Sequence, residues 1–227
     1  MKRGIRDGIP IFLGYLSVSF SFGIAAVGMA LPVWSVILTS IANLTSAGQL
    51  AGVSLIAVFA GVGELALTQL IINMRYALMS LSLSQHVDAS MTTGHRLLCA
   101  FFMTDEIFAL CRAQEKPVSK GYMYGVGFIS ALGWGLGTTL GALAGGLLPA
   151  SVCIALNPAL YAMFIAIVLP QAKRERPVLI VAGVAAVFHC VVRYTPGLDR
   201  ISSGFALILC AVAAAALGAW LFPKKEA

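Results

Sequence analysis

The sequence predicts an all-α polytopic membrane protein, and three observations support that prediction. The chain has 227 residues, 59% of them hydrophobic and only 11% charged, whereas charged residues make up about a quarter of an ordinary globular domain. Apolar stretches of the length that spans a bilayer, about 20 residues of helix, follow one another along the chain. Basic residues gather at the ends of these stretches rather than on one polar face, which argues against nucleic-acid binding and fits topology signals.

Eight apolar segments are predicted, joined by short connections rich in Gly, Pro and charged residues. They cover residues 9–31, 34–58, 62–84, 96–113, 121–148, 156–171, 177–195 and 201–222. The second segment is interrupted by the polar stretch NLTSAGQLAG at 43–52, and the fourth and sixth segments are short. Broken or re-entrant helices are therefore expected among about seven to eight hydrophobic helices.

The distribution of Lys and Arg predicts the orientation. With the eight segments threaded from a cytoplasmic N-terminus, the opposite side receives only Arg96 and Arg200. The cytoplasmic side receives Lys2, Arg3, Arg6, Arg112, Lys116, Lys120, Lys173, Arg174, Arg176, Lys224 and Lys225. This positive-inside bias places both termini in the cytoplasm.

A faint internal repeat is consistent with duplication within a single transmembrane domain, 1–227. GMALP at 28–32 is echoed by GGLLP at 145–149, and the Arg-Tyr pair at 75–76 recurs at 193–194. The halves would be 1–116 and 117–227, with four segments each and thus a parallel orientation. Separately, glycines every four residues from Gly133 to Gly145 lie on one helical face, which predicts close packing inside the chain or between subunits.

Two adjacent carboxylates, Asp105 and Glu106, lie inside the apolar segment 96–113. A charged residue in the middle of a spanning helix costs about 2.5–3.5 kcal/mol on insertion scales, so it usually faces a cavity or a partner. Neighbouring helical residues point about 100° apart, so we expect the two acids to have different partners. One would meet a substrate ammonium and the other an arginine or a proton. The alternative is that the short segment lets one acid reach interfacial water.

Arg75 is the expected counter-charge to these acids. It would form a structural salt bridge with one of them, bind a substrate carboxylate, or extend its side chain to the interface. Its segment also carries a stripe of polar residues at helical spacing, Gln69, Asn73, Tyr76 and Ser80.

The interrupted second segment is the third candidate region. Asn43, Thr45, Ser46 and Gln49 supply donors and acceptors, and Gly48 and Gly52 permit a break. A broken helix would present N–H groups suited to a carboxylate. The alternative is hydrogen bonding between helices without a ligand.

Cysteine and histidine usage predicts no cofactor, disulfide or metal site. The five cysteines, Cys99, Cys111, Cys153, Cys190 and Cys210, are scattered and form no CxxC pair. They are interpreted as small buried apolar side chains. No zinc-protease, nucleophile-elbow or phosphate-binding motif occurs.

Four stretches resemble the AzlC family of inner-membrane proteins, in family order and over about the first half of the chain. They are GIPIFLGYLSVSFSFG (8–23), SAGQLAG (46–52), NMRYALMS (73–80) and TDEIFAL (104–110). The resemblance implies the large subunit of an exporter of leucine, isoleucine and valine, with methionine as a further candidate. It also implies a small AzlD-like membrane subunit as partner and use of the proton-motive force. One departure is Asn73, since an acid often stands at this position in the family.

These residues together predict a site for an amino-acid zwitterion with an apolar side chain. Its carboxylate would meet Arg75 or the broken helix near Gly48, and its ammonium Asp105 or Glu106. The residues expected in the site are Arg75, Asp105, Glu106, Gln49, Gly48, Asn43, Asn73 and Tyr76. A non-transporting scaffold subunit, a channel, and a membrane-embedded enzyme using Asp105 and Glu106 remain as alternatives.

Overall fold

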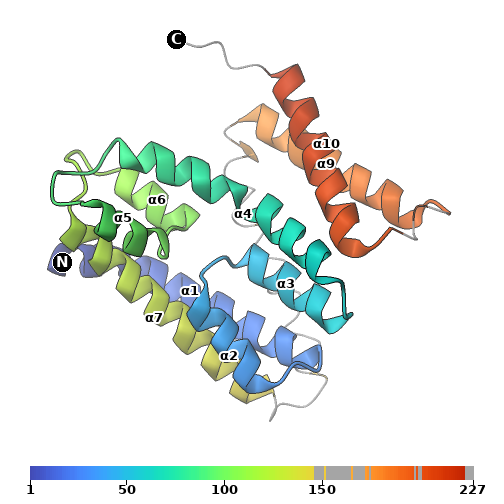
Figure 1. Cartoon of the computed structure of the whole chain (residues 1–227), viewed down its shortest axis with the longest axis horizontal. Helices are drawn as coiled ribbons and strands as arrows, with labels where there is room; N and C mark the ends of the chain where they lie inside the picture. Colours follow the sequence, from blue (N-terminus) through green and yellow to red (C-terminus); the bar gives the residue numbers. More distant parts are fainter. Residues whose placement is uncertain are drawn as a thin grey trace.

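The computed structural model describes residues 1–145, 151, 165, 172–173, 175–196, 198 and 201–222, and the part it describes is helical throughout (Figure 1). The helices are α1 (Lys2–Gly28), α2 (Val33–Ala42), α3 (Ala47–Ala57), α4 (Val62–Ser84), α5 (Thr93–Ala100), α6 (Asp105–Arg112), α7 (Lys120–Gly145), α9 (Arg176–Tyr194) and α10 (Ser203–Leu221). The all-helical prediction is confirmed for these ranges. The predicted segment 156–171 and most of the GGLLP repeat lie outside them, apart from single residues.

Four of the described helices are long and apolar enough to cross a membrane: α1, α7, α9 and α10. α4 has 23 residues, a length of about 35 Å, but it carries Glu64 and Arg75. The expected count of seven to eight hydrophobic membrane helices is not confirmed. The second and fourth predicted segments each fold as two short helices instead.

α1 and α7 lie side by side and run in the same direction (Figure 1). Gly133, Gly137 and Gly141 of α7 face the α1 backbone at Phe12, Leu16 and Phe20 in turn. The predicted glycine face is therefore confirmed as an internal contact between these two helices. The other face of α7 exposes large apolar side chains suited to lipid, namely Leu132, Leu136, Leu140 and Leu143.

Two segments of the fold are discontinuous helices, as the sequence predicted. α2 ends before Asn43, whose backbone is extended, and α3 begins after Ser46, whose φ is 33°. Asn, Thr and Ser side chains compete with helical hydrogen bonds, which explains a break at 43–46. The second break covers 101–104 and ends at Thr104, whose hydroxyl accepts a hydrogen bond from the Ile107 amide at 3.4 Å.

Each discontinuous pair turns back to the end of the molecule from which it enters. Ser54, near the end of α3, contacts Met29 just before α2. The loops on either side of α5–α6 bond to each other, because Asp88 N donates to Val118 O at 3.1 Å and Val118 N to His86 O at 2.9 Å. Loops joined in this way lie at the same end of the molecule. The fold therefore does not fit the threading that placed Arg96 opposite to Arg112, which took residues 96–113 to cross fully, and the orientation in the membrane stays a prediction.

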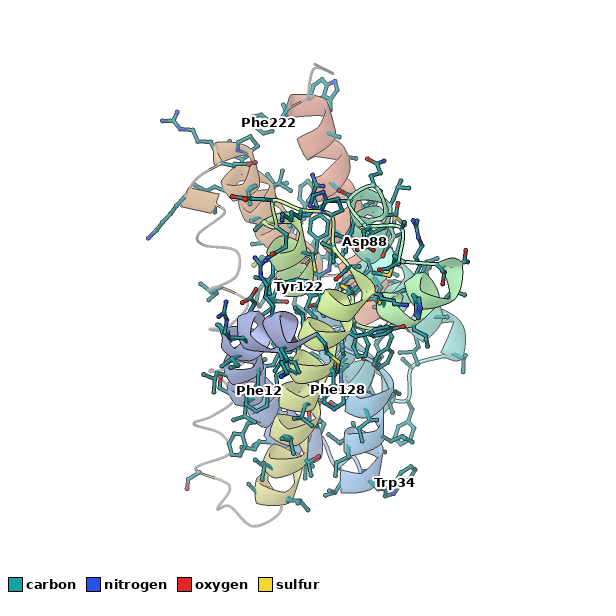
Figure 2. All side chains as sticks on the ribbon, turned by 90° about the vertical axis from the view of Figure 1, so that its left-hand side faces the viewer. Phe12, Trp34, Asp88, Tyr122, Phe128 and Phe222 are labelled. Atoms are coloured by element: carbon teal, nitrogen blue, oxygen red, sulfur yellow. The ribbon has the colours of Figure 1, made fainter. Side chains whose placement is uncertain are left out.

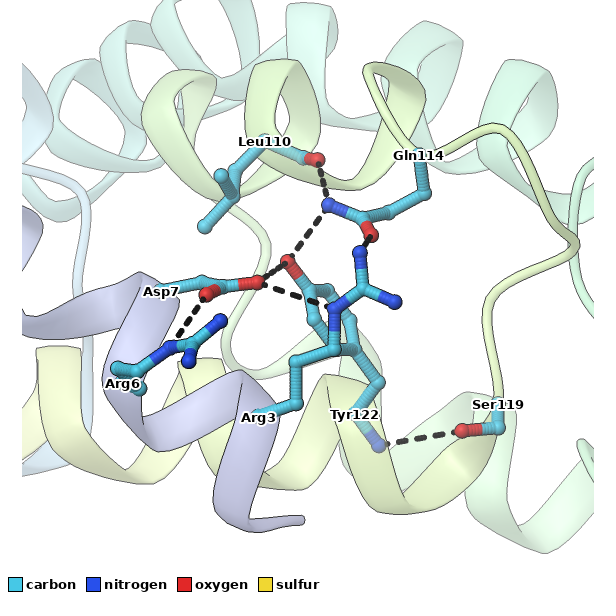
Figure 3. Close-up of polar contacts among 7 residues, drawn as sticks. All are labelled: Arg3, Arg6, Asp7, Leu110, Gln114, Ser119 and Tyr122. Carbon is cyan, nitrogen blue, oxygen red and sulfur yellow. Dashed lines mark hydrogen bonds and ion pairs between the residues drawn. The ribbon is translucent and has the colours of Figure 1, made fainter.

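Polar contacts at one end of the fold tie the start of α1 to the end of α6 and the start of α7 (Figure 3). Arg3 donates to Gln114 Oε1 at 3.0 Å, and Tyr122 donates to Asp7 Oδ2 at 3.2 Å. Figure 2 shows Asp88 and Tyr122 near one end of α7 and Trp34 near the other. Arg96 lies at this same end of the fold, since its Nε donates to Met91 O next to the bonded loop at Asp88. The cytoplasmic placement of this end stays a prediction.

Two apolar cores flank the breaks. One is built around Ile107 and Met123, between α4, α5, α6 and α7, and the other around Phe22 and Val36, between α1, α2, α3 and α7. A third, smaller cluster of Tyr15, Leu44 and Trp134 lies where the two breaks meet α1 and α7, and Phe102 packs against it. α9 and α10 pack on each other, and α10 also contacts α3 and α4. The two predicted halves stay a prediction, although the parallel α1–α7 pair fits them.

Candidate functional site

A cavity of about 330 Å³ lies where the two breaks approach the α1–α7 pair. Its apolar wall comes mainly from α1, including Ile11 and Val18. Ser46 from the first break, Glu106 from the start of α6 and Trp134 from α7 also line it. Elements that are far apart in the sequence thus bring a carboxylate, an indole and an unwound segment to one apolar chamber of ligand-binding size.

Glu106 is held in the wall of this cavity by a short hydrogen bond. The Tyr15 hydroxyl donates to Glu106 Oε2 at 2.6 Å and lies 2.7 Å from Thr104 Oγ1. Tyr15 is 8% exposed, so its own position is fixed by packing, including an edge-on contact with Trp134 at 5.3 Å between ring centres. Glu106 also lies in the first turn of α6, where the helix dipole stabilises a negative charge.

Trp134, which lines the same cavity, has a buried donor without a partner in the part of the chain that the structure describes. Its side chain is 2% exposed, and its Nε1 has no hydrogen-bond partner among the described residues. A buried donor without a partner is costly, and a bound acceptor would remove that cost. α3 begins one residue after Ser46, and its N-terminus has no side-chain cap. The wall of the cavity therefore includes an acceptor group, on Glu106, and a residue with a buried donor unpaired within the described ranges, Trp134.

Arg75 and Asp105 form an ion pair beside this cavity, as one of the sequence alternatives predicted. Arg75 Nη1 contacts Asp105 Oδ2, and Arg75 Nη2 donates to the Tyr76 hydroxyl at 3.2 Å. The guanidinium carbon also lies 4.9 Å from the centre of the Tyr76 ring. The pair links the middle of α4 to the N-terminus of α6. The two acids have different partners, in agreement with the prediction from their spacing.

Polar residues of α4 hold the first break in place at Gly48. Gln69 Nε2 donates to Gly48 O at 2.8 Å, and Asn73 Nδ2 donates to Gln69 Oε1 at 3.1 Å. A Cβ at Gly48 would lie 1.9 Å from Thr45 Oγ1 and 3.0 Å from Gln69 Oε1, so this close approach requires glycine. The polar stripe of α4 thus faces the broken helix.

A buried hydrogen-bonded chain fixes the other side of the same break. Gln49 Nε2 donates to Ser40 Oγ at 2.8 Å, and Ser40 Oγ lies 2.8 Å from Thr138 Oγ1 of α7. All three side chains are at most 2% exposed. Asn43 stays within the break, where its Oδ1 accepts from the Thr45 amide at 3.4 Å. Gln49 and Asn43 therefore shape the break between α2 and α3. Of the eight residues predicted for the site, Glu106 lines the cavity, and the other seven are not among its described lining residues.

Comparison with known proteins identifies the family to which the chain belongs. The AzlC protein family matches residues 10–148, which include both breaks, α4, α6 and all of α7. The chain belongs to the AzlC family. No solved structure matches the chain.

Two relatives of this AzlC protein are membrane proteins by name. The inner membrane protein YgaZ of Escherichia coli K12 is 28% identical over 188 residues, covering 80% of this chain and 77% of its own length. An uncharacterized membrane protein of Archaeoglobus fulgidus is 27% identical over 192 residues, covering 83% of this chain and 84% of its own length. The similarity extends beyond residue 148 and supports the membrane assignment of the whole chain.

Sequence reasoning missed three residues of the candidate site: Tyr15, Trp134 and Thr104. A tyrosine or tryptophan in an apolar run cannot be distinguished from an ordinary core residue without the fold. Thr104 was open to prediction, because Thr followed by Asp and Glu is a helix N-terminus signal. That signal would have divided the segment 96–113 at the position where the structure breaks it.

Proposed function

We propose that this chain exports leucine, isoleucine and valine, with methionine as a further candidate, as the large subunit of a two-component secondary transporter in the bacterial inner membrane. The observation that carries the proposal is the cavity between the two breaks. It combines a fixed carboxylate, Glu106, with an unsatisfied buried donor, Trp134 Nε1, and an apolar wall. A dipolar molecule with an aliphatic side chain matches these three features.

In the proposed complex, the substrate ammonium pairs with the Glu106 carboxylate. The substrate carboxylate accepts from Trp134 Nε1 and from the N-terminus of α3, where the helix dipole favours a negative group. Arg75, together with Asp105, positions the N-terminus of α6, and it remains the second candidate partner for the substrate carboxylate. The remaining predicted residues support the positions of α3, α4 and α6 around the cavity: Gly48, Gln49, Asn43, Asn73 and Tyr76.

The wall of the cavity accounts for the proposed substrate range. Ile11 and Val18 offer aliphatic contact without a polar group that could select one side chain. An apolar pocket separates substrates that differ by one methylene by only about 1–3 kcal/mol. Leucine, isoleucine and valine are therefore expected to compete with one another.

The two re-entrant pairs offer a route to alternating access. α2–α3 enters from the end where α1 finishes, and α5–α6 enters from the end where α1 begins. Movement of either pair would expose the cavity to one side. We propose that inward proton flow drives export, with Glu106 taking up a proton when the substrate ammonium leaves, and that both termini are cytoplasmic.

The test is transport in inside-out vesicles that contain the chain and its small AzlD-like subunit. Export then appears as uptake of labelled leucine when the vesicle interior is acidified. Loss of a hydrogen bond to a charged group costs about 1.5–3 kcal/mol, so Glu106→Gln is expected to lower uptake at subsaturating leucine about 10-fold or more. Glu115→Gln, in the exposed loop after α6, is the matched control.

The alternatives give different results in the same vesicles. If the chain is a scaffold, the small subunit alone transports leucine and Glu106→Gln changes nothing. If the chain is an enzyme, a substrate is converted in detergent solution without any gradient. Normal uptake by Glu106→Gln and by Trp134→Phe would remove the proposed site.

A further inference from the structure

A second cavity, of about 620 Å³, lies between α3 and α4 on one side and α9 and α10 on the other. Its volume is within the range of small-molecule sites, about 300–1,000 Å³. Leu50 and Ile72 give it an aliphatic wall, while Ser54, Thr68 and His189 add polar groups. This mixture fits a small molecule that has both a polar group and an aliphatic part.

Thr68, a residue of this cavity wall, has a hydroxyl without a hydrogen-bond partner in the described part of the chain. It is fully buried, and its Oγ1 has no hydrogen-bond partner among the described residues. Two helical threonines bond within their own helix instead: Thr39 donates to Ser35 O and Thr139 to Gly135 O, both at 2.8 Å. A buried hydroxyl without such a bond destabilises the fold unless a ligand or a water binds it.

The wall between the two cavities is the first break itself. Ser46 lines the first cavity, and the next residue, Ala47, lines the second. Ser46 has a φ of 33°, a conformation that is unfavourable for a residue with a Cβ. A rearrangement of residues 43–46 would relieve this strain.

The second cavity extends toward the end of the fold where α1 finishes. Ser54 contacts Met29 there, and Gly204 at the start of α10 also lines the cavity. Glu64 fixes this boundary, because its Oε1 accepts from Gly204 N at 2.9 Å and from Ser202 Oγ at 2.6 Å. The two cavities together thus lead from Glu106 toward the end opposite the N-terminus.

We propose that the second cavity is a transit site for the amino-acid zwitterion after it leaves Glu106. The aliphatic side chain lies against Leu50 and Ile72, a polar group of the substrate bonds the Thr68 hydroxyl, and the Ser46–Ala47 tip separates the two positions. This inference rests on the proposed function, because it places the same substrate in a second position.

Two variants of the second cavity test the transit site. Ala51→Phe fills the cavity, and Thr68→Val removes the hydroxyl at nearly constant shape. The controls are Ala77→Phe on an exposed face of α4 and Thr139→Val on α7. Leucine uptake by inside-out vesicles and equilibrium leucine binding by the purified two-subunit complex are measured for each variant. Far-UV circular dichroism of the same samples reports that each variant is folded.

A transit site predicts a split between these two measurements. Ala51→Phe lowers the uptake rate about tenfold or more while equilibrium binding at Glu106 stays within about twofold, and Thr68→Val gives a smaller change of the same kind. Uptake by both variants equal to that of the controls would overturn the transit site and leave the proposed function intact. Loss of leucine binding by a folded Ala51→Phe variant would show that the substitution acts on the first cavity. It would contradict the claim that the substrate occupies two separate positions. A wild-type complex that neither binds nor transports leucine would overturn both proposals.

Discussion

The contact between α1 and α7 depends on glycine at Gly141 but not at Gly135. A Cβ at position 141 would lie 2.0 Å from Phe20 O and 2.8 Å from Phe20 C, both backbone atoms that cannot rotate away. Ordinary contact begins at 3.4 Å, so α1 and α7 would have to separate by about 1.4 Å at this point. A Cβ at position 135 would meet nothing within 4 Å.

The two substitutions should therefore change stability in opposite directions. Overpacking costs typically 1–3 kcal/mol, about the cost expected for Gly141→Ala. Gly135→Ala should stabilise the helix by up to about 1 kcal/mol, because alanine has the higher helix propensity. The two variants should then differ by about 1–4 kcal/mol, which corresponds to roughly 2–16 °C in Tm for a chain of this size.

Thermal unfolding in detergent, followed by far-UV circular dichroism, measures this difference. The wild type should lie between the two variants, with Gly141→Ala the least stable. Equal Tm values for Gly141→Ala and Gly135→Ala would show that α1 does not pack against this face of α7, and the position of the cavity between them would lose its basis.

Three further predictions follow from the contacts at the site and at α10. Arg75→Ala should lower the Tm more than the double variant Arg75→Ala with Asp105→Ala, because the single variant leaves the Asp105 charge unpaired. The coupling energy between the two substitutions should be about 0.5–3 kcal/mol, and additive Tm changes would contradict the ion pair. Tyr15→Phe should weaken leucine binding less than Glu106→Gln does, because the Tyr15 hydroxyl orients the carboxylate but does not supply it. Unchanged leucine affinity in Tyr15→Phe would mean that the hydrogen bond does not position Glu106. Glu64→Ala should cost about 1 kcal/mol and speed amide exchange at residues 203–206, whereas unchanged exchange would show that Glu64 does not cap α10.

Hydropathy predicted the helical class and periodicity predicted the glycine face, because both depend on local sequence. The spacing of Asp105 and Glu106 also predicted that they have different partners, since neighbouring helical residues point in different directions. The threading that placed Arg96 opposite to Arg112 does not fit the fold, because it took all eight apolar runs to cross the membrane although broken helices were expected among them. The hydrogen bonds between the loops at 86–88 and 118 that correct it are long-range contacts, which hydropathy does not encode.

The candidate site was predicted in part for a similar reason. The polar break at 43–52 and the acids stand out in an apolar sequence, so both were found. Tyr15 and Trp134 belong to the site only because α1 and α7 bring them beside the breaks, and their residue types are equally common in an apolar core. The pairing of Arg75 with Asp105 rather than Glu106 depends on the rotation of α6, which begins at Thr104.

The most direct test of the site is the affinity of the two-subunit complex for leucine with and without the Glu106 charge. The wild type should bind leucine, and it should not bind 4-methylpentanoate, which keeps the side chain and carboxylate but lacks the ammonium. Glu106→Gln should bind leucine about 10-fold or more weakly, in line with the loss of a charge-assisted hydrogen bond. Leucine affinity that is the same in Glu106→Gln and wild type would contradict the assignment of this cavity as the substrate site.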